Sequence, residues 1–188
     1  MTLRLLVLSL AAMAAPAFGQ SSAMSCGLDN PTPRTVRAEG KSELVTDVVV
    51  RCTGGTPTSG ETPIPSAQVT LTFNAAVTSK VLLAPDASEV LALVDEPPAN
   101  ARYACTESAC VAFGNNEGTG YYGPSDPAMQ LFGVPNVYQG TIVSPNSVTF
   151  TMLIDPPGDG TRVYRFTNIR LDPSTVASST LQLSLIHI

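Results

Sequence analysis

The side chains of this chain that could do chemistry are carboxylates, tyrosines and cysteines, because histidine is nearly absent. One histidine occurs among 188 residues, and there is no tryptophan. With a single histidine, the chain has almost no residues from which to build a Ser-His-Asp site or a His-based metal site. The sequence also lacks a phosphate-binding loop, a dinucleotide fingerprint and a nucleophile elbow. We expect no catalytic residue and no cofactor.

Carboxylates alone can hydrolyse glycosides, so the acidic side chains keep one enzymatic alternative open. The candidates are Asp95, Glu96, Glu107 and Glu117. Asp95 and Glu96 follow an apolar segment and precede two prolines, a context that is typical of a solvated strand end. The sequence therefore predicts a non-enzymatic protein, with a carboxylate-based hydrolase as the remote alternative.

Two oxygen-rich turns could bind calcium, which prefers carboxylate and carbonyl ligands. One contains Asn115, Asn116 and Glu117, and the other contains Asp155 and Asp159. Neither follows the spacing of an EF-hand loop, and turns favour Asp, Asn and Gly for backbone reasons alone. We expect no bound metal.

The four cysteines allow three disulfide pairings. Cys105 and Cys110 are close enough in sequence to close a local loop, which leaves Cys26 to pair with Cys52. A zinc site or reactive thiols are the competing interpretation, but no Cys-x-x-Cys pair is present and an exported chain meets an oxidising environment. We predict two disulfides, the longer of which should stabilise the fold by roughly 3 kcal/mol.

Tyrosines offer a candidate binding surface. Tyr121 and Tyr122 lie in the Gly- and Pro-rich segment 114–130, and Tyr103 precedes it. Exposed tyrosines supply rigid contact area with a polar end, which suits recognition of a carbohydrate or a peptide. The plainer alternative is that one of the pair packs against the edge of the fold. Long segments of this kind are functional or mobile, and the same applies to the long loop at 53–66.

The elements that must position these carboxylates, cysteines and tyrosines are mostly β-strands, because strand patterns dominate the sequence. Residues 67–73 and 147–153 alternate apolar and polar side chains, as half-buried antiparallel strands do. Residues 47–52 repeat the alternation, and 90–94 is apolar throughout, like a strand covered on both faces. Weaker strands are expected at 35–38, 77–83, 109–113, 137–143 and 162–171.

Turn signals separate these strands. Residues 144–146 and 155–160 each predict a hairpin, the second through its Asp-Gly step. Helical periodicity is not sustained anywhere in the chain. The sequence predicts an all-β fold, an antiparallel immunoglobulin-like β-sandwich of about 8–9 strands with little or no helix.

Three arginines, Arg162, Arg165 and Arg170, fall within the last expected strand. We expect them on its solvated side, or paired with acidic neighbours on adjacent strands.

The two ends of the chain differ from its middle. Residues 1–19 have the charge, the short apolar run and the cleavage site of a signal peptide. The run is too short to span a bilayer, so we expect no membrane span in the mature protein. Residues 183–188 resemble the translation of a sequencing adapter, and the alternative is an ordinary last β-strand that ends in the core. We therefore expect one sandwich domain at 20–182, with further β-sandwich domains allowed in an untruncated chain.

The overall charge excludes one class of partner. Ten basic against fifteen acidic residues give a net charge of −5 and a pI near 4.7. Such a chain lacks the cationic surface that phosphate backbones need, so no nucleic acid is expected as a partner.

Several segments together resemble a known group of proteins. They are Val36-Arg37-Ala38-Glu39-Gly40, the run from Glu43 to Cys52, Asp155-Pro156-Pro157-Gly158 and the run from Thr161 to Arg170. They are similar to secreted bacterial proteins that form the N-terminal module of longer, adhesin-like surface proteins built from β-sandwich domains. The resemblance implies a secreted or cell-surface location, a structural or adhesive role and an unknown surface protein or glycan as partner. It implies no particular binding residue.

Overall fold

The computed structural model of the chain describes residues 23–29, 35–83, 86–105, 110–118, 134–176 and 183–187. These residues form twelve strands and two short 3₁₀ turns, and no α-helix occurs among them. The elements are β1 (Ser25–Leu28), β2 (Glu43–Leu44), β3 (Val48–Gly54), β4 (Ser66–Phe73), β5 (Ala76–Val77), β6 (Val81–Leu83), β7 (Ala87–Val94), η1 (Ala99–Ala101), β8 (Val137–Ser144), β9 (Ser147–Leu153), β10 (Gly158–Thr167), β11 (Arg170–Asp172), η2 (Pro173–Thr175) and β12 (Leu183–His187).

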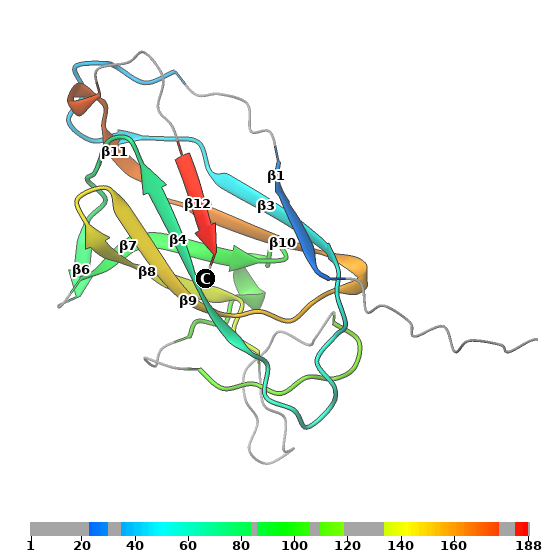
Figure 1. The fold of residues 1–188 in the computed structure, drawn as a ribbon. Coiled ribbons are helices and arrows are strands. Elements are labelled where there is room, and N and C mark those ends of the chain that lie inside the picture. The colour runs from blue at the N-terminus through cyan, green and yellow to red at the C-terminus, as the bar shows by residue number, and fades with distance from the viewer. Residues whose placement is uncertain are drawn as a thin grey trace, which may run out of the picture.

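The strands form two antiparallel sheets. The larger has nine strands in the order β1-β3-β10-β7-β8-β9-β4-β12, with β6 paired to β7 beside this path, and the smaller has the order β2-β11-β5. The larger sheet curls, so that β4 and β9 lie over β3 and β10 (Figure 1). The prediction of an all-β antiparallel sandwich with little or no helix is therefore confirmed.

The core lies between the two layers of the curled sheet. Alternate side chains of β4 and β9 point into it, and Leu71 and Phe150 are completely buried. The rings of Phe150 on β9 and Phe166 on β10 are 5.0 Å apart, although these strands are not neighbours in the sheet. Contacts of this kind join the two layers. Burying each such side chain stabilises the fold by roughly 1.5–3 kcal/mol.

Some weaker strand predictions were wrong. The segment 35–38 leads into a turn, in which the Gly40 amide donates to the Arg37 carbonyl at 3.1 Å. The segment 109–113 contributes only an isolated bridge between Phe113 and Pro63 among its described residues. The expected strand at 162–171 is two strands, β10 and β11, because the chain turns at Asn168, whose φ is 61°.

The two predicted hairpin turns have opposite outcomes. Ser144 and Ser147 face each other at the end of the β8–β9 pair, which confirms the first hairpin. The second prediction was wrong, because β9 and β10 belong to different layers and do not pair. The 155–160 segment is instead a crossover, and its buried Asp155 accepts a hydrogen bond from the Thr58 amide at 2.8 Å.

Both predicted disulfides are present, Cys26–Cys52 and Cys105–Cys110, and no cysteine is free. The first joins directly opposed residues of β1 and β3. Disulfides persist in oxidising compartments, so this pairing points to an oxidising, extracellular environment.

Candidate functional site

One row of outward-facing side chains crosses four neighbouring strands, β3, β10, β7 and β8. The register pairs Val49 with Arg165, Arg165 with Leu93, and Leu93 with Val137. Directly opposed residues of antiparallel strands point to the same face, so these four side chains lie side by side. They face away from the core that Phe166 and its neighbours occupy.

A surface hollow of about 520 Å³ opens on this outer face. Its lining residues come from β7, β8 and β10, from the segments beside them and from the residue before β3: Asp47, Leu91, Leu93, Glu96, Arg102, Ala104, Val137, Arg165, Thr167 and Asn168. Four of these are apolar and four are charged, two of each sign. Small-molecule and side-chain pockets of this size combine apolar walls with a few polar groups that fix orientation. The hollow therefore combines an apolar floor with charged groups of both signs.

The segment around Tyr103 forms one wall of the hollow and is held firmly. Ala104 bridges to Val137 of β8, and the Cys105 amide donates to the Val137 carbonyl at 2.9 Å. The Tyr103 amide donates to the side-chain oxygen of Asn136 at 2.8 Å. The Cys105–Cys110 disulfide begins at the end of this wall, so it limits how far the wall can move.

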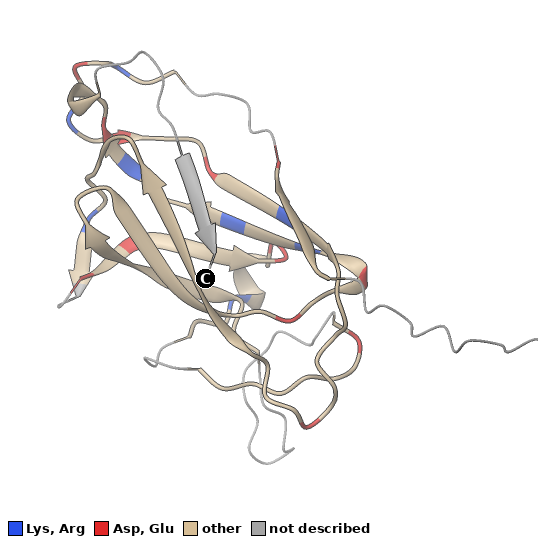
Figure 2. Cartoon of the chain, in the orientation of Figure 1, with Lys and Arg blue, Asp and Glu red and all other residues tan. Residues whose placement is uncertain are grey.

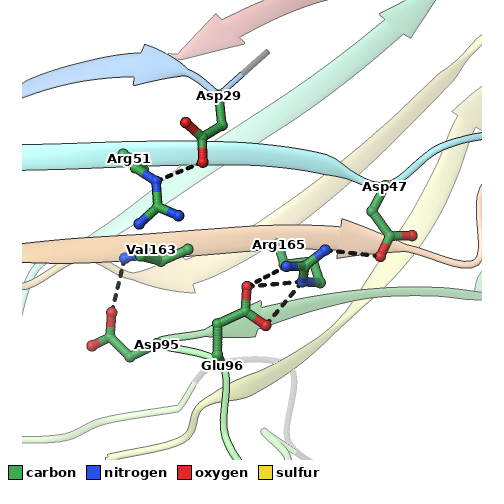
Figure 3. Close-up of polar contacts among 7 residues, drawn as sticks. All are labelled: Asp29, Asp47, Arg51, Asp95, Glu96, Val163 and Arg165. Carbon is green, nitrogen blue, oxygen red and sulfur yellow. Dashed lines mark hydrogen bonds and ion pairs between the residues drawn. The ribbon is translucent and has the colours of Figure 1, made fainter. Parts of the chain in front are cut away.

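Two carboxylates hold the guanidinium of Arg165 at the rim. Its Nη2 lies 2.5 Å from Glu96 Oε1, and its Nη1 lies 3.1 Å from Asp47 Oδ2 (Figure 3). The hydrogen bond from Arg165 lowers the pKa of Glu96, and the same contact raises the pKa of Arg165. Both groups therefore stay charged at neutral pH, and Arg165 keeps one orientation above the apolar lining.

The turn after β7 places two adjacent carboxylates on the two sides of β10. Asp95 and Glu96 have φ angles of 56° and 50°, in the left-handed region that costs a non-glycine residue about 1–2 kcal/mol. The Asp95 amide donates to the Val163 carbonyl, and Asp95 Oδ1 accepts from the Val163 amide, both at 2.8 Å. These bonds hold the strained turn in place. The prediction that this segment is a strand end is confirmed.

The outer face continues as a charged strip beyond the hollow. Arg51 of β3 pairs with Asp29 at 2.5 Å, next to the Arg165 cluster (Figure 3). Figure 2 shows basic residues within β3, β10 and β11. Arg170 of β11 pairs with Glu89 at 3.2 Å. The prediction that Arg165 and Arg170 pair with acidic neighbours is therefore confirmed.

Arg162 also pairs with an acidic neighbour, as expected, but the alternative that it lies on the solvated side is wrong, because this side chain lies on the buried face. Only 1 % of Arg162 is exposed, and it shares its face of β10 with Tyr164 and Phe166. Its Nε lies 3.1 Å from Asp95 Oδ2, and its Nη2 donates to the Gly118 carbonyl. A buried charge needs such partners because it has lost its hydration. Two-residue alternation with Tyr164 and Phe166 was the sequence signal for this placement.

Arg162 belongs to a polar cluster inside one end of the sandwich. Tyr164 and Asp155 are both buried there, and burial raises the pKa of Tyr164 and also raises that of Tyr138, to about 12. Tyr138 donates to the Pro135 carbonyl at 2.9 Å, whereas the Tyr164 hydroxyl has no hydrogen-bond partner within the described residues. Burial also raises the pKa of Asp95, more than its bond from Val163 and the charge of Arg162 lower it.

The predicted binding residues have separate outcomes. Tyr103 is half-buried beside the hollow, between Arg102 and Ala104, which line it. Tyr121 and Tyr122 lie outside the described residues, as does most of the 114–130 loop. Among the carboxylates, Asp95 and Glu96 are held by arginines as described, and Glu107 lies outside the described residues.

Two of the side-chain oxygens considered as calcium ligands, those of Asn115 and Asn116, accept hydrogen bonds from the backbone. Asn115 Oδ1 accepts from the Glu117 amide at 3.0 Å, and Asn116 Oδ1 accepts from the Gly60 amide at 3.0 Å. These bonds are what turn residues make for conformational reasons. Across the described part of the chain, His, Cys, Asp and Glu gather nowhere in a group of three that could hold a metal ion.

Sequence reasoning missed the hollow itself. The apolar run at 90–94 predicted a strand covered on both faces, and Leu93 on its outer face is indeed only 8 % exposed. What no local pattern indicates is that β10 and β8 flank this strand and bring Arg165 and Val137 beside it.

No protein-family model, curated protein or solved structure matches this chain. Among the residues that the structure describes, no helix has the length and apolar character needed to cross a membrane.

Proposed function

We propose that this chain is an exported, non-enzymatic β-sandwich module with a structural or adhesive role at the bacterial cell surface. Its partner is a surface protein or glycan. The observation that carries the proposal is the outer-face hollow, in which apolar side chains of β7 and β8 lie beneath a rim of fixed charges. Interfaces combine an apolar centre with a polar rim in the same way.

Two further features support this role. The sequence opens with the charge and apolar pattern of a signal peptide, and both cysteine pairs form disulfides of the kind that exported proteins retain. The rim is rigid before any partner arrives, because Arg165 is held by Asp47 and Glu96. A preorganised rim lowers the entropy lost on binding.

The proposal is tested by filling the hollow. The disulfide-bonded protein is passed over immobilised extracellular-matrix proteins, peptidoglycan and a glycan array. Thr167→Arg places a large side chain in the hollow, whereas Thr141→Arg changes an exposed residue of β8 outside the lining set. We expect at least one immobilised component to bind the native protein and the control, and not the Thr167 variant. Equal binding by both variants would exclude the hollow as the contact site.

A carbohydrate-binding module is the second candidate, and the position of Tyr103 between two lining residues favours it. Glycan-array signals that Tyr103→Ala, Tyr121→Ala or Tyr122→Ala abolishes would support recognition by these tyrosines and the 114–130 loop. Release of cleaved sugar from the same array would instead support the carboxylate-based hydrolase.

A further inference from the structure

Arg102 differs from the other arginines of the described ranges in what its charge meets. The others each pair with a carboxylate at 2.5–3.2 Å: Arg37, Arg51, Arg162, Arg165 and Arg170. Arg102 is exposed, lines the hollow and forms no ion pair with any residue that the structure describes. Its positive charge is therefore available to a ligand that enters the hollow.

A hydrogen bond fixes how the Arg102 guanidinium can bind such a ligand. Its Nε donates to the Pro97 carbonyl at 3.3 Å, which leaves the end of the planar fork that carries Nη1 and Nη2. The two nitrogens of such a fork match the two oxygens of a carboxylate, and this paired arrangement is stronger and more specific than a single hydrogen bond. The contact with Pro97 also restricts the side chain before a ligand arrives, which lowers the entropy lost on binding.

The second cation of the hollow, Arg165, does not offer the same site. Glu96 and Asp47 already bind its guanidinium, and their two negative charges exceed its single positive charge. The chain around Arg102 lies on the other side of the apolar floor. Arg102 precedes the segment whose Ala104 bridges to β8, whereas Arg165 is on β10 and β7 lies between these two strands. A carboxylate that enters the hollow is therefore attracted to Arg102 and repelled from the Arg165 cluster.

The apolar floor of the hollow determines what accompanies this carboxylate. Its residues are all aliphatic: Leu91, Leu93, Ala104 and Val137. A sugar ring would lay its hydroxyl groups over these carbons, where they lose water without gaining partners, which costs free energy. An aliphatic side chain gains free energy from the same contact. The floor therefore favours a polypeptide over a glycan.

We propose that Arg102 is the anchor of a peptide-binding site, which takes a polypeptide segment that carries an acidic side chain beside aliphatic ones. The carboxylate binds the Nη1 and Nη2 end of Arg102, and the aliphatic side chains cover the apolar floor. This inference rests on the proposed function, because it names the chemistry of the partner that the hollow accepts.

Two capped tripeptides test this assignment, one with glutamate between two leucines and one with glutamine in its place. Each is titrated into the disulfide-bonded, isotope-labelled protein, and the shifts of its backbone amide resonances give the dissociation constant. We expect the glutamate peptide to bind about tenfold more tightly, because hydrogen bonds to a charged group are stronger than neutral ones. Methyl glucuronide, a carboxylate on a sugar ring, is the glycan probe and should bind more weakly than the glutamate peptide.

Variants locate the preference for glutamate. Arg102→Gln removes the charge and should abolish the preference, whereas Arg102→Lys keeps the charge without the fork and should retain part of it. Lys80→Gln is the matched control, because it removes an exposed cation outside the lining set and changes the net charge equally. It should leave the preference unchanged. Thr167→Trp fills the hollow without adding charge and should weaken the binding of both peptides.

The outcomes separate this inference from the proposed function. No binding of either peptide, equal affinity for the two, or a preference that survives Arg102→Gln would overturn the assignment of Arg102. Tighter binding of methyl glucuronide would overturn the choice of a polypeptide. Each of these results leaves the hollow open to another partner. Glutamate-peptide binding that Thr167→Trp leaves intact would instead exclude the hollow as the contact site, and both proposals would fail.

Discussion

Arg162 and Arg165 lie on the same strand, β10, but face opposite sides of the sheet. Arg162 points into the sandwich and is almost completely buried, with Asp95 and the Gly118 carbonyl as partners. Arg165 points outward, keeps 32 % of its side chain exposed and binds Glu96 and Asp47. The buried arginine packs its stem among core residues and cannot be removed without leaving a void. The outer arginine is partly exposed, so water already screens its charge. The inner face should therefore determine stability, and the outer face is free to serve recognition.

The largest expected effect is the removal of the buried arginine. Arg162→Ala leaves a cavity, takes away the partner of the Gly118 carbonyl and leaves Asp95 without its cation, so unfolding free energy should fall by about 3–5 kcal/mol. Arg165→Ala on the outer face should lower it by at most about 1 kcal/mol. Chemical denaturation measures both. Arg162→Met, which keeps the volume, should recover part of the loss, and equal losses for Arg162→Ala and Arg165→Ala would contradict the distinction between the faces.

The second prediction concerns two hydroxyls on the buried face. Tyr138→Phe removes a hydrogen bond to the Pro135 carbonyl and should cost about 1 kcal/mol. Tyr164→Phe removes a hydroxyl without a hydrogen-bond partner in the described structure, and should leave stability unchanged or raise it by about 1 kcal/mol. Thermal and denaturant unfolding of the two variants form a matched pair. Destabilisation of the Tyr164 variant would reveal a partner for that hydroxyl.

The third prediction concerns the ion pair at the rim of the hollow. Glu96→Gln should lower unfolding free energy by less than about 1 kcal/mol, because the exposed Arg165 regains hydration when it loses this partner. The difference should shrink further at high salt, which screens exposed charges. Measuring the variant and the native protein at low and high ionic strength tests this. An effect that salt leaves unchanged would mean that the rim is less hydrated than its exposure indicates.

The smallest expected effects are two pH dependences of opposite sign. Burial raises the pKa of Asp95 from 3.8. The folding stability that the protonated side chain contributes is therefore fully present below pH 3.8 and is lost as pH rises through the pKa of the folded state. The hydrogen bond from Arg165 lowers the pKa of Glu96 from 4.5. The folding stability that the charged side chain contributes is therefore fully present above pH 4.5 and is lost as pH falls through the pKa of the folded state.

Unfolding titrations between about pH 3 and about pH 7 separate the two carboxylates. Relative to the native protein, Asp95→Asn should gain stability as pH rises, whereas Glu96→Gln should lose it. Slopes of the same sign would mean that the two side chains share one environment.

The difference between the faces of β10 also shows how far the sequence could predict this structure. Alternation in β4 and β9 predicted both the strands and their buried sides, because a two-residue period depends only on local sequence. The same period applied to Tyr164 and Phe166 places Arg162 inside. The expectation that charged side chains are solvated favoured the opposite side, which is wrong, whereas the alternative of pairing with an acidic neighbour is confirmed. The buried charge is met here by Asp95 and by the Gly118 carbonyl, which are distant in sequence.

The candidate site was less predictable than the fold. Each strand beside the hollow was anticipated, but their order was not, because β10 lies between β3 and β7 through connections that carry no local signal. The expected hairpin at 155–160 failed for the same reason. The chain does turn in this segment, but the turn belongs to a crossover between the layers. The Asp155 side chain anchors this crossover by accepting a hydrogen bond from the Thr58 amide. The cysteines were predictable because short sequence separation and elimination left one pairing.

The bond between Cys26 and Cys52 has a mechanical consequence. A force that pulls on the chain before Cys26 cannot peel β1 from the edge of the sheet. The disulfide transmits this force directly to β3 at Cys52. The neighbour that then resists is β10, paired with β3 from Gly158 to Phe166. Pulled along its axis, β3 would have to slide past β10 and break these hydrogen bonds together instead of one after another. The residues of β1 and the loop up to Cys52 are thereby shielded from the pull, and the sheet interior carries it.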